Sequence, residues 1–299
     1  AFETDASGLL SFANAAPVSG SWPYQVDGQN VLPYGTVVLT ERSTIDGLSK
    51  AGDPVAFTVT DDSKVTPVGS WPDLSTNADV AGTYENTIWK GSVTVYKADA
   101  DSHSTTPQGD GAFDGISYEI INRSDAPVVV DGKEIAVDAQ VMVLESEVTD
   151  GVATASSGSV LPYGTYEIRE LSGNDSYNDA EWSRTFTIRS DGQHVSFGDI
   201  PDWNEDDVKR GTIQITKVDA DFQASTPQGD ADLAGASYDI YNQSNAPVYV
   251  QGSWYDKGEK VATVSSVWSD AENAYVATMS GLPYGTYEVR ESGSPIGYA

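Results

Sequence analysis

A lysine recurs in this sequence at a strand position where an apolar side chain is expected. Side chains in a strand alternate between two faces, so Lys97 shares a face with Val93 and Val95 in the segment VTVYKADAD. The related segment IQITKVDAD places Lys217 in the same phase with its isoleucines. The simple alternative is a strand that ends at the lysine, whose stem then reaches water or whose charge protects a sheet edge.

A glutamate ends the apolar face of the strand that follows each copy of LPYGT. In the best-defined copy, Tyr166 and Ile168 are in phase with Glu170, and Glu41 and Glu291 occupy the same place in the other two copies. Taken singly, each glutamate is explained by a strand end that enters solvent. Three repeats of the pattern favour a common role inside the fold.

An asparagine or aspartate is in phase with apolar residues near the end of each repeat. Asn86 shares a face with Ile88, and Asp206 is its gapless equivalent 120 residues later. Asn204 lies on the same face as Asp206 and competes with it, while Asp199 is a weaker third candidate.

These three residue types can react with one another if they are buried together. Loss of hydration lowers the pKa of a lysine and raises that of a carboxylic acid, so both can be neutral at pH 7. A neutral amine is a nucleophile, and a protonated glutamate can polarise the acceptor carbonyl and move protons to the leaving group. The product is an amide between two side chains, with loss of ammonia from asparagine or water from aspartate. It also removes the cost of unpaired polar groups in a core.

The elements that must position these residues belong to a long internal repeat. LPYGT occurs at residues 32–36, 161–165 and 282–286, and TPQGD at 106–110 returns 120 residues later. Self-similarity at such a period indicates an array of copies of one module. We predict three parts, namely the C-terminal part of a truncated module (residues 1–91), a complete module (92–211) and the N-terminal part of another truncated module (212–299).

Strand signals dominate each copy. Short alternating segments such as SVTVYK, GTYEIRE and SRTFTIRSDG are separated by Gly, Pro, Asn and Asp, a pattern typical of antiparallel sandwiches. LPYGT is interpreted as a turn that leads into a strand. The sequence predicts an all-β fold of tandem Ig-like or prealbumin-like antiparallel β-sandwich modules, with short and therefore semi-rigid junctions.

Charge and composition exclude several classes of partner. The net charge is −29, from 45 acidic and 16 basic side chains. Nucleic acid needs Lys and Arg to displace its counterions, and anionic lipid needs the same charges, so we expect neither nucleic-acid binding nor direct membrane contact. Without cysteine, thiolate chemistry is excluded. The acidic loops lack EF-hand spacing, and His103 is not repeated, so we predict no metal and no cofactor.

Several motifs together resemble the Cna-B-type domains, also called SpaA-like or prealbumin-like, of Gram-positive pilins and cell-wall-anchored adhesins. They are ITKVDAD (215–221), LAGASYDIY (233–241), LPYGTYEVRESGSPIGY (282–298) and YENTIWKGS (84–92). In that family the opening-strand lysine, a glutamate and a closing-strand asparagine form an autocatalytic intramolecular isopeptide bond.

The resemblance implies a set of crosslinking residues for each part of this chain. In the middle module they are Lys97, Glu170 and Asp206, with Asn204 as the alternative acceptor. The first part keeps Glu41 and Asn86, and the third keeps Lys217 and Glu291. Aspartate at position 206 departs from the usual asparagine.

The function that follows is structural. We expect stalk repeats of a surface adhesin or pilus protein, extracellular and attached to the cell wall of a Gram-positive bacterium, whose first partners are neighbouring modules of the same chain. The alternative is that the modules bind a host matrix protein or glycan, for which Trp254 and Tyr255 in the divergent segment 251–261 are the candidates. Packing over a loop is the simpler explanation of those two aromatics. We expect no enzyme acting on external substrates, since no repeated His, Cys or cofactor loop supports one.

Overall fold

The chain divides into two compact units, Ala1–Ile88 and Trp89–Ala299. The structure is a computed structural model that describes residues 1–7, 10, 17–21, 24–50, 54–61, 64–68, 85–179, 181–198 and 202–299. The described residues form strands and turns without a helix. The three-part division at residues 91 and 211 stays a prediction.

The first unit contains small antiparallel sheets. β3 pairs with β5 and β5 with β6, β1 pairs with β2, and β4 pairs with β7. Phe57 and Val59 on β5 are buried. The strands are β1 (Gln25–Val26), β2 (Gln29–Asn30), β3 (Gly35–Leu39), β4 (Leu48–Ser49), β5 (Val55–Asp61), β6 (Lys64–Val68) and β7 (Thr87–Ile88).

The middle module, in the second unit, is a two-layer sandwich. One sheet has the order β12-β9-β16-β17, and the other has β8 at its centre, paired with β14, β15, β18 and β19. Its strands are β8 (Lys90–Asp99), β9 (Ser117–Asn122), β10 (Val128–Val130), β11 (Lys133–Ile135), β12 (Gln140–Glu145), β13 (Glu147–Thr149), β14 (Val152–Ser156), β15 (Leu161–Pro162), β16 (Gly164–Ser172), β17 (Ser183–Ile188), β18 (His194–Phe197) and β19 (Asn204–Asp206).

The core of the middle module lies between these two sheets. Val93 and Val95 of β8 pack in one cluster with Tyr118 of β9 and with Tyr166 and Ile168 of β16. All five side chains are at most 1% exposed. The alternation that predicts Tyr166 and Ile168 inward is therefore observed. β8 is different, because residues on both of its faces are covered.

The first and last strands of the middle module run parallel. β18 pairs with the first half of β8, and β19 pairs with its end, in the register Asn204↔Lys97 and Asp206↔Asp99. The other strand pairs of this module are antiparallel. The parallel pair brings the start and the end of the module side by side.

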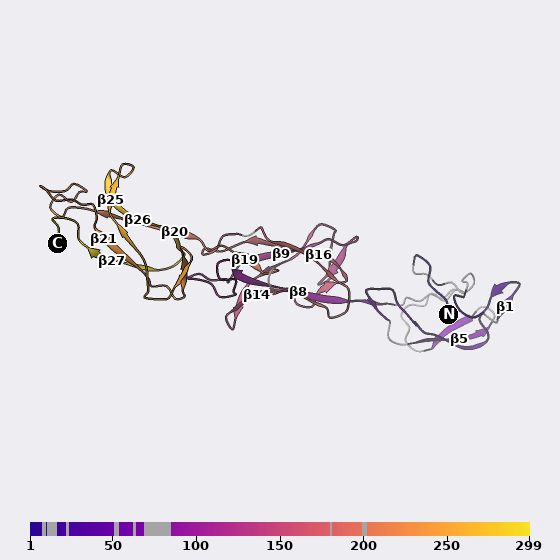
Figure 1. Ribbon diagram of the computed structural model, residues 1–299. Helices are drawn as coiled ribbons and strands as arrows, with labels where there is room; N and C mark the ends of the chain where they lie inside the picture. The colour runs from indigo at the N-terminus through magenta and orange to yellow at the C-terminus, as the bar shows by residue number, and fades with distance from the viewer. Residues whose placement is uncertain are drawn as a thin grey trace. The chain divides into compact units, whose positions relative to one another are not determined.

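The third module repeats most of this arrangement. Sheets β20-β26-β25 and β24-β21-β27 correspond to the two layers, and β22 pairs with β23. Figure 1 shows its strands as a group that follows the one around β8. The strands are β20 (Arg210–Lys217), β21 (Ser237–Asn242), β22 (Val248–Val250), β23 (Ser253–Tyr255), β24 (Lys260–Ser265), β25 (Val267–Ser269), β26 (Ala274–Pro283) and β27 (Tyr287–Gly293).

Hairpin turns follow the sequence closely. Asp131 and Gly132 join β10 to β11 with φ of 50° and 77°, and Asp150 and Gly151 join β13 to β14 with φ of 53° and 79°. Two positive φ values in succession suit the twist of a two-residue hairpin, and Asp-Gly tolerates them well.

The LPYGT turn is fixed by the hydroxyl of the tyrosine that follows it. The Tyr166 hydroxyl donates to the Pro162 carbonyl at 2.7 Å, and the Tyr287 hydroxyl donates to the Pro283 carbonyl at 2.9 Å. The turn needs its glycine, because a Cβ at Gly164 would lie 2.5 Å from the Ser124 hydroxyl oxygen.

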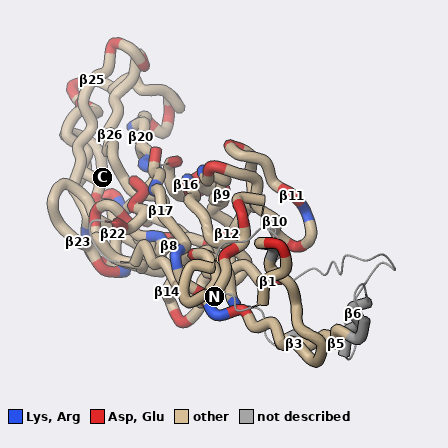
Figure 2. Tube along the Cα trace, turned by 90° about the vertical axis from the view of Figure 1, so that its right-hand side faces the viewer, with Lys and Arg blue, Asp and Glu red and all other residues tan. Residues whose placement is uncertain are grey.

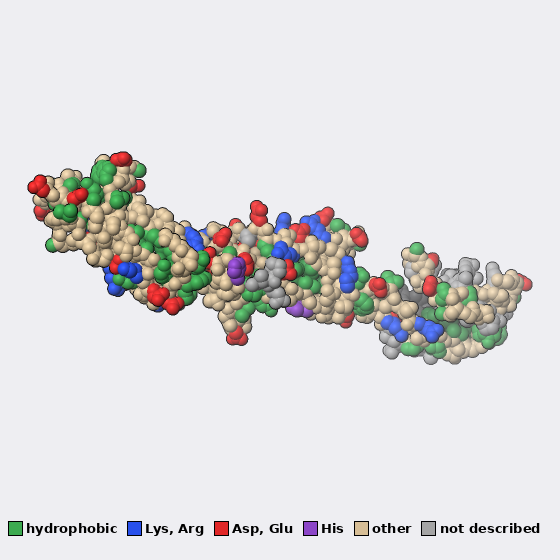
Figure 3. Space-filling model, in the orientation of Figure 1, with side chains coloured by type: hydrophobic (Ala, Val, Ile, Leu, Met, Phe, Trp, Pro, Cys, Tyr) green, Lys and Arg blue, Asp and Glu red, His purple; other side chains and the backbone are tan. Residues whose placement is uncertain are grey.

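The predicted fold class is confirmed as all-β, with several small antiparallel sheets in multiple modules. Acidic residues occupy many of the loops and strand ends (Figure 2). Hydrophobic side chains on the visible face are scattered among polar ones (Figure 3). Among the described residues, no helix is long and apolar enough to cross a membrane.

Candidate crosslinking site

Lys97 is buried in the middle module and is surrounded by the predicted reaction partners. Its Nζ donates to Glu170 Oε2 at 2.9 Å and to Asn204 Oδ1 at 2.5 Å. The same nitrogen contacts Asp206 Oδ2 as an ion pair. The side chains of Lys97, Glu170 and Asp206 are 0%, 1% and 0% exposed. The structure thus brings all four residues together.

Three strands from two layers position this cluster. Lys97 lies on β8 and Glu170 on β16 of the facing sheet, so their contact spans the interior of the sandwich. The parallel register of β19 sets Asn204 directly beside Lys97. Because side chains two apart share a face, Asp206 reaches the same nitrogen from the next inward position.

The Asp206 carboxyl holds a proton more readily than an ordinary aspartate. Burial raises the pKa of Asp206, the opposing charge of Lys97 lowers it and the negative charge of Glu170 raises it, which together bring the pKa to about 7. The two Asp206 oxygens have no well-aligned hydrogen bond among the described residues. The carboxyl therefore contacts the amine as an ion pair without a well-aligned hydrogen bond.

Tyr118 completes the site, and the sequence argument missed it. Its hydroxyl donates to Asn204 Oδ1 at 2.6 Å, and burial raises the pKa of this hydroxyl well above its usual range. Tyr118 pairs with Glu170 across β9 and β16, as Tyr238 pairs with Glu291 in the third module. That recurrence was visible in SYEII and SYDIY, but a tyrosine in a strand is also an ordinary core residue.

Asn204 has a distinct place in the cluster. Its carbonyl oxygen accepts hydrogen bonds from both Lys97 and Tyr118. Its amide nitrogen is buried and has no hydrogen-bond partner within the part of the chain that the structure describes. Asn204 thereby orients the amine. The third candidate acceptor, Asp199, lies outside the described residues.

The partial sets in the other two parts are also brought together. In the first unit, Asn86 Nδ2 donates to Glu41 Oε1 at 3.1 Å, and the Asn86 carbonyl oxygen is buried. In the third module, Lys217 Nζ donates to Glu291 Oε1 at 2.8 Å, with side chains 16% and 37% exposed. The lysine–glutamate contact is therefore present without the burial found in the middle module.

The two candidate ligand-binding aromatics differ in their surroundings. Trp254 is 42% exposed, and its ring lies 5.1 Å from that of Tyr249. Tyr255 packs against the core of the third module. Of the pair, only Trp254 presents a substantial surface.

Two aspartates of the acidic loops accept hydrogen bonds from backbone amides of their own loops. Asp99 Oδ1 accepts from the amides of Asp101 and Ser102 at 3.0 and 2.8 Å, and Asp219 accepts in the same way from Asp221 and Phe222. Across the described ranges, no group of three or more His, Cys, Asp or Glu side chains is arranged to hold a metal ion.

Comparison with known proteins gives a family match in the third part of the chain, which does not include this site. Residues 211–299 match the SpaA family, described as a prealbumin-like fold domain. No curated protein sequence matches the chain.

Several solved structures are similar over most of the chain. The Bacillus anthracis TIE protein is 20% identical over 92% of this chain and 40% of its own length, with a TM-score of 0.49. A streptococcal ancillary pilin is 18% identical, covering 92% and 72% of the two chains, with a TM-score of 0.30. BcpA, the major pilin subunit of Bacillus cereus, is 14% identical, covering 98% and 83%, with a TM-score of 0.27. The chain thus spans about two fifths of the length of the TIE protein.

Proposed function

We propose that these pilin-like, prealbumin-like repeats are the stalk modules of a Gram-positive surface protein, and that an amide bond between Lys97 and Asp206 closes the middle module. The observation that carries the proposal is the buried Lys97 amine held between Glu170, Asp206 and Asn204. A salt-bridge network with no covalent outcome would leave several polar groups without hydration in the core, at a cost of several kcal/mol per ion.

The reaction needs a neutral amine beside a neutral carboxyl group. With a pKa of about 7, Asp206 can hold a proton at neutral pH, and Lys97 is the adjacent source of one. The Lys97 nitrogen attacks Cγ of Asp206 and a C–N bond forms. The C–O bond to the Asp206 hydroxyl then breaks, and this hydroxyl leaves as water with a proton that Glu170 carries over from the nitrogen.

Asp206 is the better acceptor because the proton carrier reaches it. Glu170 and Asp206 contact the same amine, and the charge of Glu170 acts on the Asp206 pKa, so one carboxyl group lies beside both the amine and the departing oxygen. Asn204 engages the amine through its carbonyl oxygen, which Tyr118 holds from the other side. In this arrangement Asn204 is a positioning residue, and its reaction instead of Asp206 would release ammonia.

The intact mass of the full chain tests the crosslink. We expect a loss of about 18 Da through water, together with a proteolytic fragment in which the peptides of β8 and β19 remain joined. Lys97→Ala and Glu170→Gln should each abolish the loss, while Lys217→Ala should leave it unchanged. If the wild-type protein is folded and protease-resistant but its mass is not reduced, the crosslink proposal is wrong. The fold and the repeat would be unaffected by that result.

Two acceptor variants decide between the neighbouring residues. Asp206→Asn should change the loss to about 17 Da, because the same attack now expels ammonia. Asn204→Ala should retain the loss of water at a lower rate. If Asn204→Ala abolishes the loss and Asp206→Ala preserves a loss of about 17 Da, Asn204 is the acceptor instead.

The mechanical role follows from where the two strands lie. β8 opens the module, β19 closes it, and the two are neighbours. A bond between Lys97 and Asp206 would carry tension from one end of the module to the other without loading the strands between them. Modules of this kind keep a distal part of a surface protein at a fixed distance from the cell wall. The only chemistry we assign to the chain is this single self-reaction, with no turnover of an external substrate.

A binding role is the second candidate, and the exposure of Trp254 favours it. Aromatic side chains of this kind serve as contact residues for proteins and sugars. A screen of the full chain against matrix proteins and glycans should show saturable binding that Trp254→Ala abolishes and Tyr284→Ala, at another exposed aromatic, preserves. Without such binding the modules are spacers.

A further inference from the structure

Three recurring segments meet where the middle module joins the third. We name them the TPQGD loop, the APV loop and the LPYGT turn. The TPQGD loop is residues 106–110 in the middle module and 226–230 in the third. The APV loop is residues 125–129 and 245–249, and the LPYGT turn is residues 161–165 and 282–286, in the same order. The TPQGD loop of the middle module bonds to the APV loop and to the LPYGT turn of the third.

Backbone hydrogen bonds form the centre of this junction. The Gly109 amide donates to the Pro247 carbonyl at 3.0 Å, and the Ala246 amide donates back to the Gly109 carbonyl at 2.9 Å. The Asp110 amide donates to the Tyr284 carbonyl at 3.2 Å. The two loops are therefore joined through their backbones in both directions.

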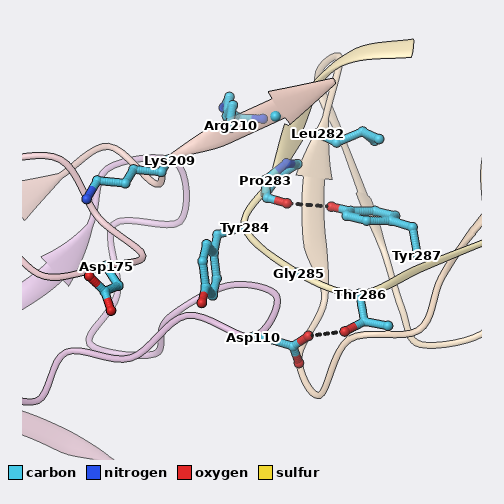
Figure 4. A pocket seen from close by; sticks show the side chains of 11 residues that line it. Asp110, Asp175, Lys209, Arg210, Leu282, Pro283, Tyr284, Gly285, Thr286 and Tyr287 are labelled. Carbon is cyan, nitrogen blue, oxygen red and sulfur yellow. Dashed lines mark hydrogen bonds between the residues drawn. The ribbon is translucent and has the colours of Figure 1, made fainter. Parts of the chain in front are cut away.

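Side chains extend the same contact. Asp110 accepts from the Asn245 amide at 2.8 Å. It also accepts from the Thr286 hydroxyl at 2.7 Å (Figure 4). Gln108 Oε1 accepts from the Tyr249 amide at 3.0 Å. Asn245 belongs to the APV loop and Thr286 to the LPYGT turn. The Asp110 carboxylate therefore binds two of the recurring segments of the third module.

A basic residue at the start of β20 completes the junction. Arg210 donates through Nη2 to Asp101 Oδ2 at 2.6 Å and through Nη1 to the Tyr249 carbonyl at 2.9 Å. Lys90 occupies the equivalent place at the start of β8. The junction therefore pairs an acidic loop with a basic residue that each copy supplies.

The TPQGD loop of the third module is shaped in the same way. Gln108 Nε2 donates to Asp99 and Asp101 at 2.9 and 2.6 Å. Gln228 Nε2 donates to Asp219 and Asp221 at 3.0 and 2.8 Å.

A tyrosine hydroxyl accepts a hydrogen bond from the backbone of each TPQGD loop. The Gln108 amide donates to Tyr177 Oη at 2.9 Å, and the Gln228 amide donates to Tyr298 Oη at 3.2 Å. The second copy of the loop is thus preformed, including the acidic residue that would meet a basic partner.

The two copies differ in what covers them. Gln108 and Gly109 are buried, whereas Gly229 and Asp230 are exposed. A Cβ at Gly109 would lie 2.2 Å from the Tyr284 carbonyl oxygen, while a Cβ at Gly229 would meet no atom within 4 Å. The loop at 226–230 therefore has the conformation of the loop at the junction, with Gly229 and Asp230 exposed.

We propose that residues 226–230, with Asp221, form a docking site for a further repeat module, of the kind that follows the middle module here. Its occupant supplies a basic residue to Asp221, an APV loop to Gly229, and an LPYGT turn to Asp230. TPQGD and LPYGT are identical in the two copies, and the APV loop keeps its Ala-Pro-Val. The docking does not depend on the crosslink.

Extension of the full chain by one repeat tests this site. Tyr298 occupies the place of Tyr177 against the loop, so a second copy of residues 179–299 placed after Ala299 continues the period. In the chain as it stands, the Gly109 amide should exchange its hydrogen slowly and the Gly229 and Asp230 amides rapidly. In the extended chain, we expect exchange at Gly229 and Asp230 to slow at least tenfold.

Matched variants separate docking from other effects. Asp230→Ala should abolish the slowing in the extended chain and leave the thermal melting of the original chain unchanged. Asp110→Ala in the original chain should speed exchange at Gly109. Extension by residues 179–209 alone should not slow Gly229, because it adds no docking partner. Slow exchange at Gly229 in the original chain, slowing by residues 179–209 alone, or rapid exchange in the extended chain would each overturn the proposal.

Discussion

Tyr118 and Glu170 occupy paired positions on neighbouring strands, and both side chains engage the cluster around Lys97. Glu170 accepts a hydrogen bond from the amine, while Tyr118 donates one to the asparagine that holds the same amine. Directly opposed residues of an antiparallel pair share a face, so one strand pair delivers a carboxyl group and a hydroxyl to the same buried point.

Loss of the Tyr118 hydroxyl should slow crosslinking without preventing it. In Tyr118→Phe, Asn204 loses a buried hydrogen bond, worth about 1 kcal/mol, and orients Lys97 less well. We expect a mixture of crosslinked and unreacted middle module by intact mass soon after synthesis. Tyr238→Phe, the equivalent change in the third module, is the matched control and should give full reaction. Equal reaction in both variants would show that the hydroxyl has only a packing role.

The stability of an uncrosslinked middle module should fall as pH rises. In Lys97→Met no bond can form, and removal of the lysine charge cannot lower the Asp206 pKa below its value of about 7. An acid with a raised pKa in the folded state binds more protons folded than unfolded between its ordinary value of 3.8 and its folded value. The loss of folding free energy caused by ionising buried Asp206 is therefore absent below about pH 4, and it grows as the pH rises to about 7.

Denaturant unfolding of Lys97→Met between pH 4 and pH 8 measures this effect. The double variant Lys97→Met, Asp206→Ala should show a flatter dependence, because the titrating group is gone. An equal slope in the two variants would mean that Asp206 titrates normally in the folded module.

Amine labelling should distinguish the two lysines. The Lys97 side chain is 0% exposed and that of Lys217 is 16% exposed, so an amine reagent should modify Lys217 first in the folded chain. In urea, wild-type Lys97 should remain unlabelled because its nitrogen is in an amide, whereas Lys97 of Glu170→Gln should react. Peptide mapping checks both statements, and labelling of wild-type Lys97 in urea would contradict the bond.

Stretching should reveal where tension runs in the middle module. An uncrosslinked Lys97→Met module should release the residues between positions 97 and 206 when it unfolds, a contour gain of roughly 370 Å at about 3.4 Å per residue. The wild-type module should show no such step, since the bond bypasses those residues. Single-molecule force spectroscopy on the full chain makes the measurement. A wild-type step of the full length would contradict a covalent bond between Lys97 and Asp206.

Much of this fold follows from local patterns in the sequence. The period of LPYGT and TPQGD indicates an array, and alternation along residues 164–170 predicts which side chains of β16 face the core. Asp131-Gly132 and Asp150-Gly151 predict hairpins, because few other pairs tolerate two positive φ values. The alternation of strand side chains also identifies Lys97 and Glu170 as candidates, because these charged residues are in phase with buried apolar ones.

The sequence by itself left the acceptor undecided. Asn204 and Asp206 are two residues apart, so a period of two places both on one face. The tertiary structure adds a distinction that supports our assignment of Asp206, because Glu170 on β16 of the opposite sheet acts on the Asp206 pKa while Tyr118 donates to Asn204.

Tertiary structure also decided two longer-range relationships. The parallel pairing of β8 with β19 joins residues more than 100 positions apart, and such a register is set by sheet assembly, not by any neighbouring residue. The identity of TPQGD in two copies was visible in the sequence. Only the fold shows one copy buried against a neighbouring module and the other exposed, since burial depends on which surfaces meet and leaves no local signature in the chain.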